Sequence, residues 1–329
     1  MSILVTGGAG FVGLNLLEAL LGRGESVVAF DRQAVPAAAR DDFAALPGRL
    51  HVVSGDVRDR DAIARAMAAH DVDRLIHAAA VTAGAARDAA DPGGIAEINL
   101  VGTIRALEAA HERGLRRVVH VSTGAVYGEL GIVGDNQLDE VRDPVRPVGM
   151  YAITKYAAER ACLRLAALWG MDIVVGRPAM VFGRWEYESG VRERMALPLE
   201  TVRLAIRGEE ARILRVEEQR DWIYAPDLAA GLIALLDASG LSSKVFNVGT
   251  GMPWDIRDWC ERLVAAYPGF RYRFVTDPAA ANVLPLAAVG RSPFRVERIR
   301  AEAGFTPRYP FERAFDDYTA WLRSHAAFG

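Results

Sequence analysis

The sequence predicts an α/β fold: a doubly wound parallel sheet covered by helices, with a smaller C-terminal lobe beside it. Two observations lead to this prediction. Short apolar runs alternate with amphipathic segments through the first half of the 329 residues, which is the order of strands and helices in βαβ units. The runs themselves, such as VVAF at 27–30 and VVHV at 118–121, are almost wholly apolar. Strands of this kind are buried on both faces, as they are in parallel sheets.

The first 178 residues contain the periodic elements of the predicted sheet. We expect strands at 3–6, 27–31, 51–54, 74–77, 117–122 and 173–177, and helices at 12–23, 59–69, 95–113 and 149–168. A helical pattern at 227–236 and an apolar run at 245–248 indicate that the chain later returns to the main sheet. The Ala-rich segments 36–46 and 277–288 are interpreted as loops or short helices.

The pattern becomes irregular after Arg177, where glycine, tryptophan, proline and charged residues mix. We therefore predict two domains built from separated segments. The first, of residues 1–178 plus about 226–250, is the doubly wound sheet. The second, of residues about 179–225 and 251–329, is a substrate-binding lobe packed over the ends of the strands.

Composition excludes several classes of function. The net charge of −3 offers no attraction to nucleic acid or to anionic membranes. No apolar run reaches the length of about 18 residues that a membrane span needs, and no basic segment precedes the first strand as in a signal peptide. We expect a cytoplasmic protein. The six histidines show no metal-ligand spacing, and Cys162 and Cys260 form no disulfide framework, so no metal site is expected.

A glycine motif, TGGAGFVG at 6–13, directly follows the first strand and opens the first helix. Gly7, Gly10 and Gly13 let the backbone approach a pyrophosphate, and the helix N-terminus offers N–H groups to its charge. Asp31 ends the second strand, where a carboxylate accepts hydrogen bonds from the adenosine ribose and repels a 2′-phosphate. The cofactor predicted from this Rossmann-type motif is NAD, although the neighbouring Arg32 is a side chain that also suits a phosphate.

Further phrases follow in a fixed order along nearly the whole chain. They are SGDVRD at 54–59, IHAAA at 76–80, NLVGT at 99–103, VSTGAVYG at 121–128, YAITK at 151–155, GRPAMVFG at 176–183, QRDWIYAPDLA at 219–229 and FNVGTG at 246–251. Together with the glycine motif, they resemble the extended short-chain dehydrogenase/reductase family, in its group of NAD-dependent sugar epimerases and dehydratases.

The resemblance implies a set of cofactor contacts and a catalytic group of three side chains. The implied NAD-binding residues are Gly7, Gly10, Phe11, Val12, Gly13, Asp31, Arg32, Asp56, Val57, Ala78, Ala79, Ala80, Asn99, Ser122, Tyr151, Lys155 and Pro178. The implied catalytic residues are Thr123, Tyr151 and Lys155. Thr123 is chosen over Ser122 because in the family the reactive hydroxyl stands four residues before the tyrosine of the VYG phrase.

Chemistry accounts for the spacing of Tyr151 and Lys155, which lie one helical turn apart on a shared face. Oxidation of an alcohol needs a base for the hydroxyl proton, and a tyrosine with a pKa of about 10 is a poor base at neutral pH. A nearby ammonium and a positive nicotinamide ring favour the phenolate. Lys155 is also expected to hold the nicotinamide ribose, and Thr123 to donate a hydrogen bond to the reacting oxygen.

The two residues after Thr123 bear on the type of reaction. Sugar-nucleotide 4,6-dehydratases of the family carry an acidic pair there, whereas this chain has Gly124 and Ala125. We therefore disfavour dehydration and expect an epimerase, which oxidises a carbinol to a ketone and reduces it again. A dehydrogenase of a free sugar, a polyol or a sugar acid remains the alternative. A non-catalytic NAD-binding sensor fits less well, because such relatives lose the tyrosine or the lysine.

The resemblance implies a substrate that is a sugar, a sugar acid or a sugar nucleotide. Thr82, Thr123, Arg220 and Arg291 are the substrate-side candidates, since an Arg fork suits both phosphate and carboxylate. The asparagine that contacts the substrate diphosphate in sugar-nucleotide relatives is absent from AMVFG at 179–183. The resemblance also implies a homodimer, formed through the helices at 95–113 and 149–168.

Overall fold

A computed structural model describes residues 1–128, 137–215, 219–285 and 291–329. Its main sheet has seven parallel strands in the order β10-β6-β5-β4-β1-β2-β3. These strands are β1 Ser2–Thr6, β2 Ser26–Asp31, β3 Arg49–Ser54, β4 Val72–His77, β5 Arg117–Val121, β6 Ile173–Pro178 and β10 Val245–Val248. The predicted fold class, including the late return of the chain to this sheet, is confirmed.

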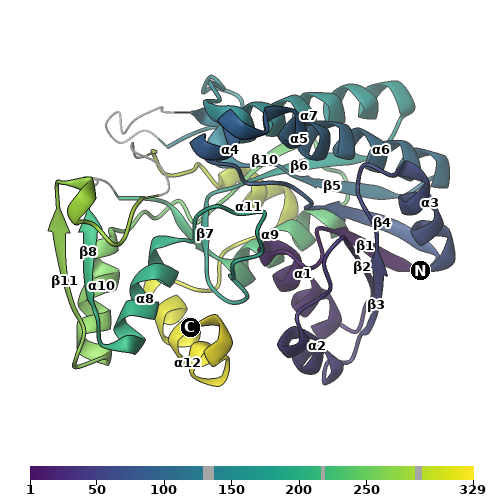
Figure 1. Cartoon of the computed structure of the whole chain (residues 1–329). Helices are drawn as coiled ribbons and strands as arrows, with labels where there is room; N and C mark the ends of the chain where they lie inside the picture. Colours follow the sequence, from purple (N-terminus) through teal and green to yellow (C-terminus); the bar gives the residue numbers. More distant parts are fainter. Residues whose placement is uncertain (129–136, 216–218, 286–290) are drawn as a thin grey trace.

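Helices cover both faces of the sheet (Figure 1). They are α1 Phe11–Gly22, α2 Ala37–Ala44, α3 Arg60–Ala69, α4 Ala85–Ala90, α5 Pro92–Ala96, α6 Gly102–Arg113, α7 Gly149–Trp169 and α9 Ala225–Asp237. Side chains alternate along each strand, so Leu4 packs with α3 and α6 on one face while Ile3 and Val5 pack with α1 and α9 on the other. Within the described residues, no helix is long and apolar enough to cross a membrane.

The helix predicted at 95–113 is divided in the structure. A π-helical turn at Glu97–Val101 separates α5 from α6. Such turns insert an extra residue into a helix and are frequent at functional sites. Here the turn contains Asn99, which is completely buried. The Ala-rich segment 36–46 contains α2. The described part of 277–288 contains the 3₁₀ turn Pro278–Ala280 and an isolated bridge from Val283 to Ile213.

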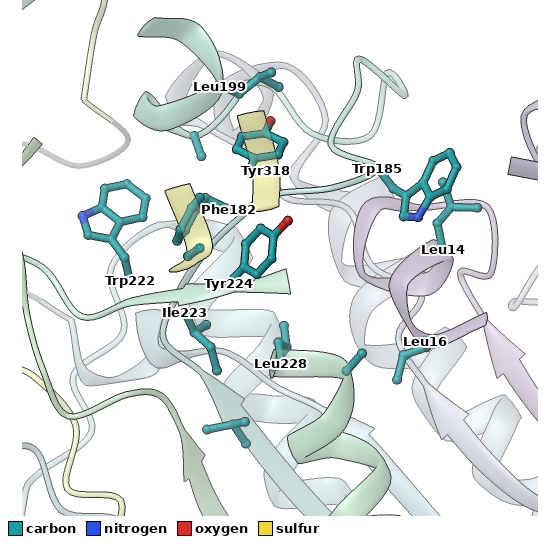
Figure 2. Packing of buried hydrophobic residues seen from close by; sticks show 14 of the residues in the cluster. Leu14, Leu16, Phe182, Trp185, Leu199, Trp222, Ile223, Tyr224, Leu228 and Tyr318 are labelled. Carbon is teal, nitrogen blue, oxygen red and sulfur yellow. The ribbon is translucent and has the colours of Figure 1, made fainter. Parts of the chain in front are cut away.

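The rest of the chain builds the lobe at the carboxyl ends of the strands. Its elements are β7 Met180–Phe182, α8 Leu197–Arg207, β8 Glu210–Leu214, β9 Trp222–Tyr224, α10 Ile256–Ala266, β11 Arg271–Val275, α11 Glu297–Ala303 and α12 Phe311–Ser324. Figure 2 shows Phe182 among aromatic side chains of this lobe, with its ring centroid 5.4 Å from that of Tyr224. The same apolar core continues into α1 through Leu14 and Leu16. The predicted domain boundaries stay a prediction.

Candidate active site

The glycine loop after β1 has the tight backbone that the motif predicts. Gly7 has a φ of +69°, and a Cβ there would lie 2.8 Å from the Ala79 backbone. A Cβ on Gly13 would lie 2.0 Å from the Gly7 carbonyl oxygen. Both positions therefore require glycine. Phe11 and Val12 follow at the start of α1 and are partly buried.

The N-terminus of α1 is open to an anion. Its N-cap is Gly10, which has no side chain to accept a hydrogen bond from the first N–H groups. Helix N-termini with uncapped N–H groups bind phosphate, because these groups and the helix dipole all present positive charge. The geometry of the loop therefore suits the pyrophosphate of a dinucleotide.

Acidic side chains lie at the predicted adenosine end of the cleft. Asp31 accepts hydrogen bonds from Ala9 N at 3.1 Å and from Gln33 N at 3.0 Å, which holds the carboxylate at the end of β2. Asp56 is held by Arg58, whose Nη2 lies 2.6 Å from Oδ2, and this contact lowers the pKa of Asp56. Arg32 is exposed and lies 3.9 Å from Asp56. This is the charge pattern expected for ribose recognition.

Residues 78–80 line the loop after β4, beside the glycine motif. Ala78 N donates to Thr6 O, and Ala79 packs against Gly7. The Val57 side chain lies on the other side of this region, where it would meet a Cβ on Gly102 at 2.8 Å. These close contacts are consistent with the predicted cofactor cleft.

Asn99 fixes the loop after β4 to the helix that carries the catalytic pair. Its Oδ1 accepts from Val81 N at 2.8 Å, and its Nδ2 donates to Val81 O and to Thr154 Oγ1, both at 3.1 Å. Thr154 lies on α7 beside Lys155. The side-chain amide of Asn99 is therefore engaged within the protein, and its predicted contact with the cofactor stays a prediction.

Thr123 and Tyr151 lie within hydrogen-bonding reach of each other at the carboxyl end of β5, and Lys155 follows one turn further along α7. Tyr151 lies in the first turn of α7, and Thr123 follows β5. Burial raises the pKa of Tyr151, while hydrogen bonding with Thr123 and Thr82 and the charges of Arg192 and Arg291 lower it. Thr123 Oγ1 accepts a hydrogen bond from Ala125 N at 3.1 Å. Its own proton can therefore be donated to the Tyr151 oxygen, in the hydrogen bond that lowers the pKa of Tyr151.

Lys155 is 1% exposed, and its Nζ has no hydrogen-bond partner among the described residues. Burial lowers its pKa to about 8, although Cys162 and Glu159 oppose this change. An unpaired ammonium in the core is costly. The ribose hydroxyls of a bound dinucleotide are the acceptors that this group lacks, so the buried Nζ fits the predicted cofactor.

The backbone carbonyl of Ser122, just after β5, has no hydrogen-bond donor from the neighbouring strand β6. Ser122 N donates to Gly176 O at 2.8 Å. In a parallel ladder the next bond would run from the backbone nitrogen of residue 178 to Ser122 O, but Pro178 has no N–H. The predicted cofactor contact of Ser122 through its backbone is thus compatible with the structure, as is the place of Pro178 at the strand end.

Two substrate-side arginines from distant segments lie near each other, and Arg291 also lies near Tyr151. Arg220 is 7% exposed and precedes β9. Arg291 donates from Nε to Gly128 O at 3.3 Å. Burial and the charge of Arg220 lower the pKa of Arg291 to about 10, and Tyr151 acts in the opposite direction. Two neighbouring cations are well placed for an anionic substrate group. Thr82 lies on the same side, in hydrogen-bonding reach of Tyr151.

The position after Thr123 has no room for a side chain. A Cβ on Gly124 would lie 2.4 Å from Cζ of Phe294 and 2.9 Å from Pro178 O. Phe294 is 1% exposed and its ring packs against Tyr127 at 5.8 Å between centroids. The ring therefore fills the space next to Gly124. Tyr127, the other nearby tyrosine, donates to Asn247 Oδ1 at 2.8 Å, and burial raises its pKa to about 12.

Residues 184–193, which we call the covering segment, were not among the predicted site residues. The segment is anchored on α1 through Trp185, whose Nε1 donates to Glu18 Oε2 at 2.6 Å, and Figure 2 shows Trp185 beside Leu14. Tyr187 then donates its hydroxyl proton to Ala9 O of the glycine loop at 2.7 Å. The Gln33 side chain, after β2, donates to the backbone of the segment at 2.7 Å.

The other end of the covering segment is bound to the loop after β4. Thr82 N donates to Val191 O at 2.9 Å. The Arg192 guanidinium lies 5.2 Å from the Phe11 ring centroid and pairs with the buried Glu186 at 2.9 Å. The segment thus contacts the loops after β1, β2 and β4. The mixture of aromatic and charged residues after a strand end was the one sequence feature that could have indicated a role for this segment. Its sequence has no periodicity that would predict where the segment lies.

Among the described residues, no group of three or more His, Cys, Asp or Glu side chains is arranged to hold a metal ion. The two ring nitrogens of His77 form hydrogen bonds within the core: Nδ1 lies 2.7 Å from Thr6 Oγ1, and Nε2 lies 3.1 Å from Thr103 Oγ1. Burial lowers its pKa to about 3 and also lowers that of His120. Both histidines are therefore neutral core residues, and the candidate chemistry belongs to Tyr151, Lys155 and Thr123.

Comparison with known proteins gives similar relatives over the whole chain. The model of the NAD dependent epimerase/dehydratase family matches residues 3–249. A dTDP-glucose 4,6-dehydratase of Actinoplanes sp. is 29% identical over 344 residues, covering 100% of this chain and 99% of the relative. A UDP-glucose 4-epimerase of Mycolicibacterium smegmatis is 30% identical over 260 residues, covering 78% of this chain and 80% of the relative. The solved UDP-glucose 4-epimerase of Thermus thermophilus in complex with NAD has a TM-score of 0.79 and 26% identity, covering 98% of this chain and 99% of that chain.

Proposed function

The chain belongs to the NAD-dependent epimerase/dehydratase family, and from this premise we propose that it is a sugar-nucleotide epimerase. Its cofactor is NAD, and bound NAD would supply the hydride acceptor for oxidation of the substrate carbinol and the hydride donor for reduction of the ketone. Tyr151 takes the hydroxyl proton as the hydride leaves, and Thr123 donates a hydrogen bond to the oxygen. Tyr151 returns the proton when the hydride arrives on the other face, which inverts the carbon.

One observation carries the choice of epimerisation over dehydration. Elimination of water needs an acid and a base beside the sugar ring, and the family resemblance implies that 4,6-dehydratases carry them directly after the catalytic threonine. In this chain the first of the two positions is Gly124, and the ring of Phe294 fills the space that a carboxylate there would need. Ala125 at the second position cannot transfer a proton. The site therefore supports oxidation and reduction but lacks the usual groups for elimination.

The lobe supports a nucleotide on the substrate. Arg220 and Arg291 lie close enough for each charge to affect the other, and a diphosphate between them would offset their repulsion. The paired cations favour a sugar nucleotide, which carries a diphosphate, over a free sugar.

The covering segment favours an epimerase over a net dehydrogenase. An epimerase restores its NAD in each turnover, so the cofactor does not need to leave, whereas a dehydrogenase must release NADH. The contacts of the segment with Ala9, Gln33 and Thr82 place it across three loops of the predicted cofactor cleft. A segment held in this way slows the exit of a bound dinucleotide.

Tyr187→Phe tests this role of the covering segment. The change removes the hydrogen bond to Ala9 O and little else, and a hydrogen bond of this kind contributes about 1 kcal/mol. We expect the affinity for NAD to fall about fivefold, mainly through faster dissociation, with kcat unchanged at saturating NAD. Calorimetry and stopped-flow release of NADH measure this. Tyr267→Phe, in the lobe, is the matched control, and an equal loss in the control would contradict the assignment.

Product analysis tests the proposed function directly. The purified protein is first examined for retained NAD and then incubated with UDP-glucose and, separately, dTDP-glucose, with the products identified by NMR. We expect retained NAD and conversion of a sugar nucleotide to an isomer with no net NADH. A 4-keto-6-deoxy sugar would instead show a dehydratase.

The alternative of a dehydrogenase of a free sugar, polyol or sugar acid is tested in the same series. Net NADH formed with such a compound, together with no isomer of a sugar nucleotide, would exclude the proposed epimerase. Ala179 and Met180, which replace the expected asparagine, are the residues that keep this alternative open.

The homodimer and the cytoplasmic location also remain proposals. Ile153 and Leu168 are exposed apolar side chains on α7, at 45% and 56%, and α7 packs beside α6. These two helices form the face through which we propose that two copies pair.

A further inference from the structure

A buried carboxylate that the proposed chemistry does not use lies below the catalytic pair. Glu159 is four residues after Lys155 and eight after Tyr151 on α7, so all three share one face of the helix. Its side chain is 1% exposed. A charge in such a place is retained only when partners satisfy it.

Two strands supply these partners. Arg177 donates from Nε to Oε2 of Glu159 at 3.0 Å and from Nη2 to Oε1 at 2.5 Å, which is a two-bond ion pair. Ser122 donates from Oγ to Oε2 at 3.1 Å. Ser122 lies at the end of β5 and Arg177 near the end of β6. The carboxylate thus binds α7 to both strand ends at once.

Both residues that bind Glu159 are neighbours in sequence of a residue predicted to lie at the reaction centre. Ser122 immediately precedes Thr123, and Arg177 immediately precedes Pro178. The third segment, α7, carries Tyr151 and Lys155 themselves. One side chain therefore sets the positions of the three segments that carry the predicted catalytic and nicotinamide-side residues.

We propose that Glu159 is the positioning residue of the active site, acting through Ser122 and Arg177 to hold Thr123, Tyr151 and Lys155 in one reactive arrangement. The proposal rests on the proposed function only in taking Tyr151, Thr123 and Lys155 as the reacting groups, and it is independent of the substrate.

The surroundings of Arg177 extend this arrangement to a third strand, β10. Its guanidinium lies 4.9 Å from the Tyr127 ring centroid, and the Tyr127 hydroxyl bonds to Asn247 on β10. Such a network gives specificity of geometry rather than stability, because replacing a buried ion pair by apolar side chains of similar size is often neutral for stability. The two roles can therefore be separated by experiment.

The test uses the double variant Glu159→Leu/Arg177→Met in the full-length protein, which removes both charges and leaves neither unpaired. The matched control is Arg117→Met/Asp172→Leu. That pair joins the opposite ends of the same two strands, with Arg117 Nη2 2.6 Å from Asp172 Oδ2. Ser122→Ala, which removes a single hydrogen bond to Glu159, serves as a milder second variant if the first does not fold.

The first measurement is the Kd of NAD by calorimetry, with and without Lys155→Met. If Glu159 positions Lys155, the double variant weakens NAD binding about tenfold when Lys155 is present and less than about twofold in the Lys155→Met background. The control pair changes neither value. Equal weakening in both backgrounds, no weakening, or the same weakening in the control would overturn the proposal.

The second measurement is the split between kcat and KM with the substrate found above. We expect kcat to fall at least about tenfold with KM for the sugar nucleotide nearly unchanged, since the reacting groups are displaced while the lobe is intact. Ser122→Ala should fall in the same direction by a smaller factor. Wild-type kcat in the double variant would overturn the proposal. If the wild-type protein turns over no sugar nucleotide, the proposed function fails, and the NAD measurement still decides the role of Glu159.

Discussion

Tyr151→Phe is expected to lower kcat by about a thousandfold or more, because it removes the only group at the site that we assign to proton transfer. The ring remains in place, so the helix, the fold and the binding of NAD should be preserved. Steady-state kinetics with the identified substrate and calorimetric titration of NAD measure the two properties separately. The expected result is loss of turnover with an unchanged Kd for NAD.

Tyr156→Phe is the matched control on the same helix, five residues further on, and should retain wild-type kcat. Residual activity of Tyr151→Phe within tenfold of wild type would mean that another group takes the proton. Tyr127 is a poor substitute for that role, since its hydroxyl is bonded to Asn247 and burial raises its pKa to about 12.

The pH dependence of the rate also tests whether Tyr151 accepts the substrate proton. Burial raises the pKa of Tyr151, and only the phenolate accepts the substrate proton. The rate should therefore rise with pH, and this rising limb should be displaced towards lower pH by the positive nicotinamide ring of bound NAD. The limb should be absent from the residual activity of Tyr151→Phe.

Lys155→Met is expected to have the second-largest effect. It should abolish turnover but raise the stability of the folded protein. Turnover should be lost, since Lys155 is the residue that we expect to favour the phenolate and to hold the nicotinamide ribose. The cofactor-free protein should become more stable at pH 7, because the pKa of Lys155 is lowered from 10.5 to about 8 in the fold. The folded state then binds this proton less tightly than the unfolded chain. The cost is on the order of 3 kcal/mol below pH 8.

Because the pKa of Lys155 is lower in the folded protein than in the unfolded chain, the free energy of unfolding depends on pH between these two pKa values. Between pH 8 and 10.5 the unfolded chain holds the proton that the folded protein has released, so stability of the wild-type protein rises with pH there. Lys155→Met should remove this rise. Thermal unfolding across that range measures it, with Lys244→Met, a partly exposed surface lysine, as the control. A lower Tm for Lys155→Met at pH 7 would contradict the unpaired state of the ammonium.

Lysine at position 155 stands out in a chain whose only other lysine is Lys244, all remaining long cations being arginine. An arginine keeps its charge at any accessible pH and needs room for a planar fork, whereas an ammonium is compact and tolerates desolvation by shifting its pKa. The chemistry of a dry site next to a ribose therefore suits lysine. NAD as the cofactor is consistent with lysine rather than arginine at position 155, because its ribose can accept hydrogen bonds from a compact ammonium.

Local patterns predicted the sheet and its loops well. Strands such as β1 and β2 are short apolar runs whose alternate residues face opposite layers. Glycine at position 13 is required by a contact within the loop, with the Gly7 carbonyl oxygen, whereas the close contact of Gly7 is with the distant Ala79. The helix at 95–113 was predicted less well, since the π-helical turn at Asn99 depends on bonds to Val81 and Thr154. Helical periodicity contains no information on such distant partners.

The sequence by itself determined the doubly wound sheet, the cofactor and the spacing of Tyr151 and Lys155, because each depends on residues close together in the chain. Only the tertiary structure decided what surrounds them. Phe294 fills the space beside Gly124, Tyr187 reaches Ala9, and Glu159 meets Ser122 and Arg177. These contacts join segments from 18 to 178 residues apart. Packing of the whole core brings them together, and no local propensity encodes it.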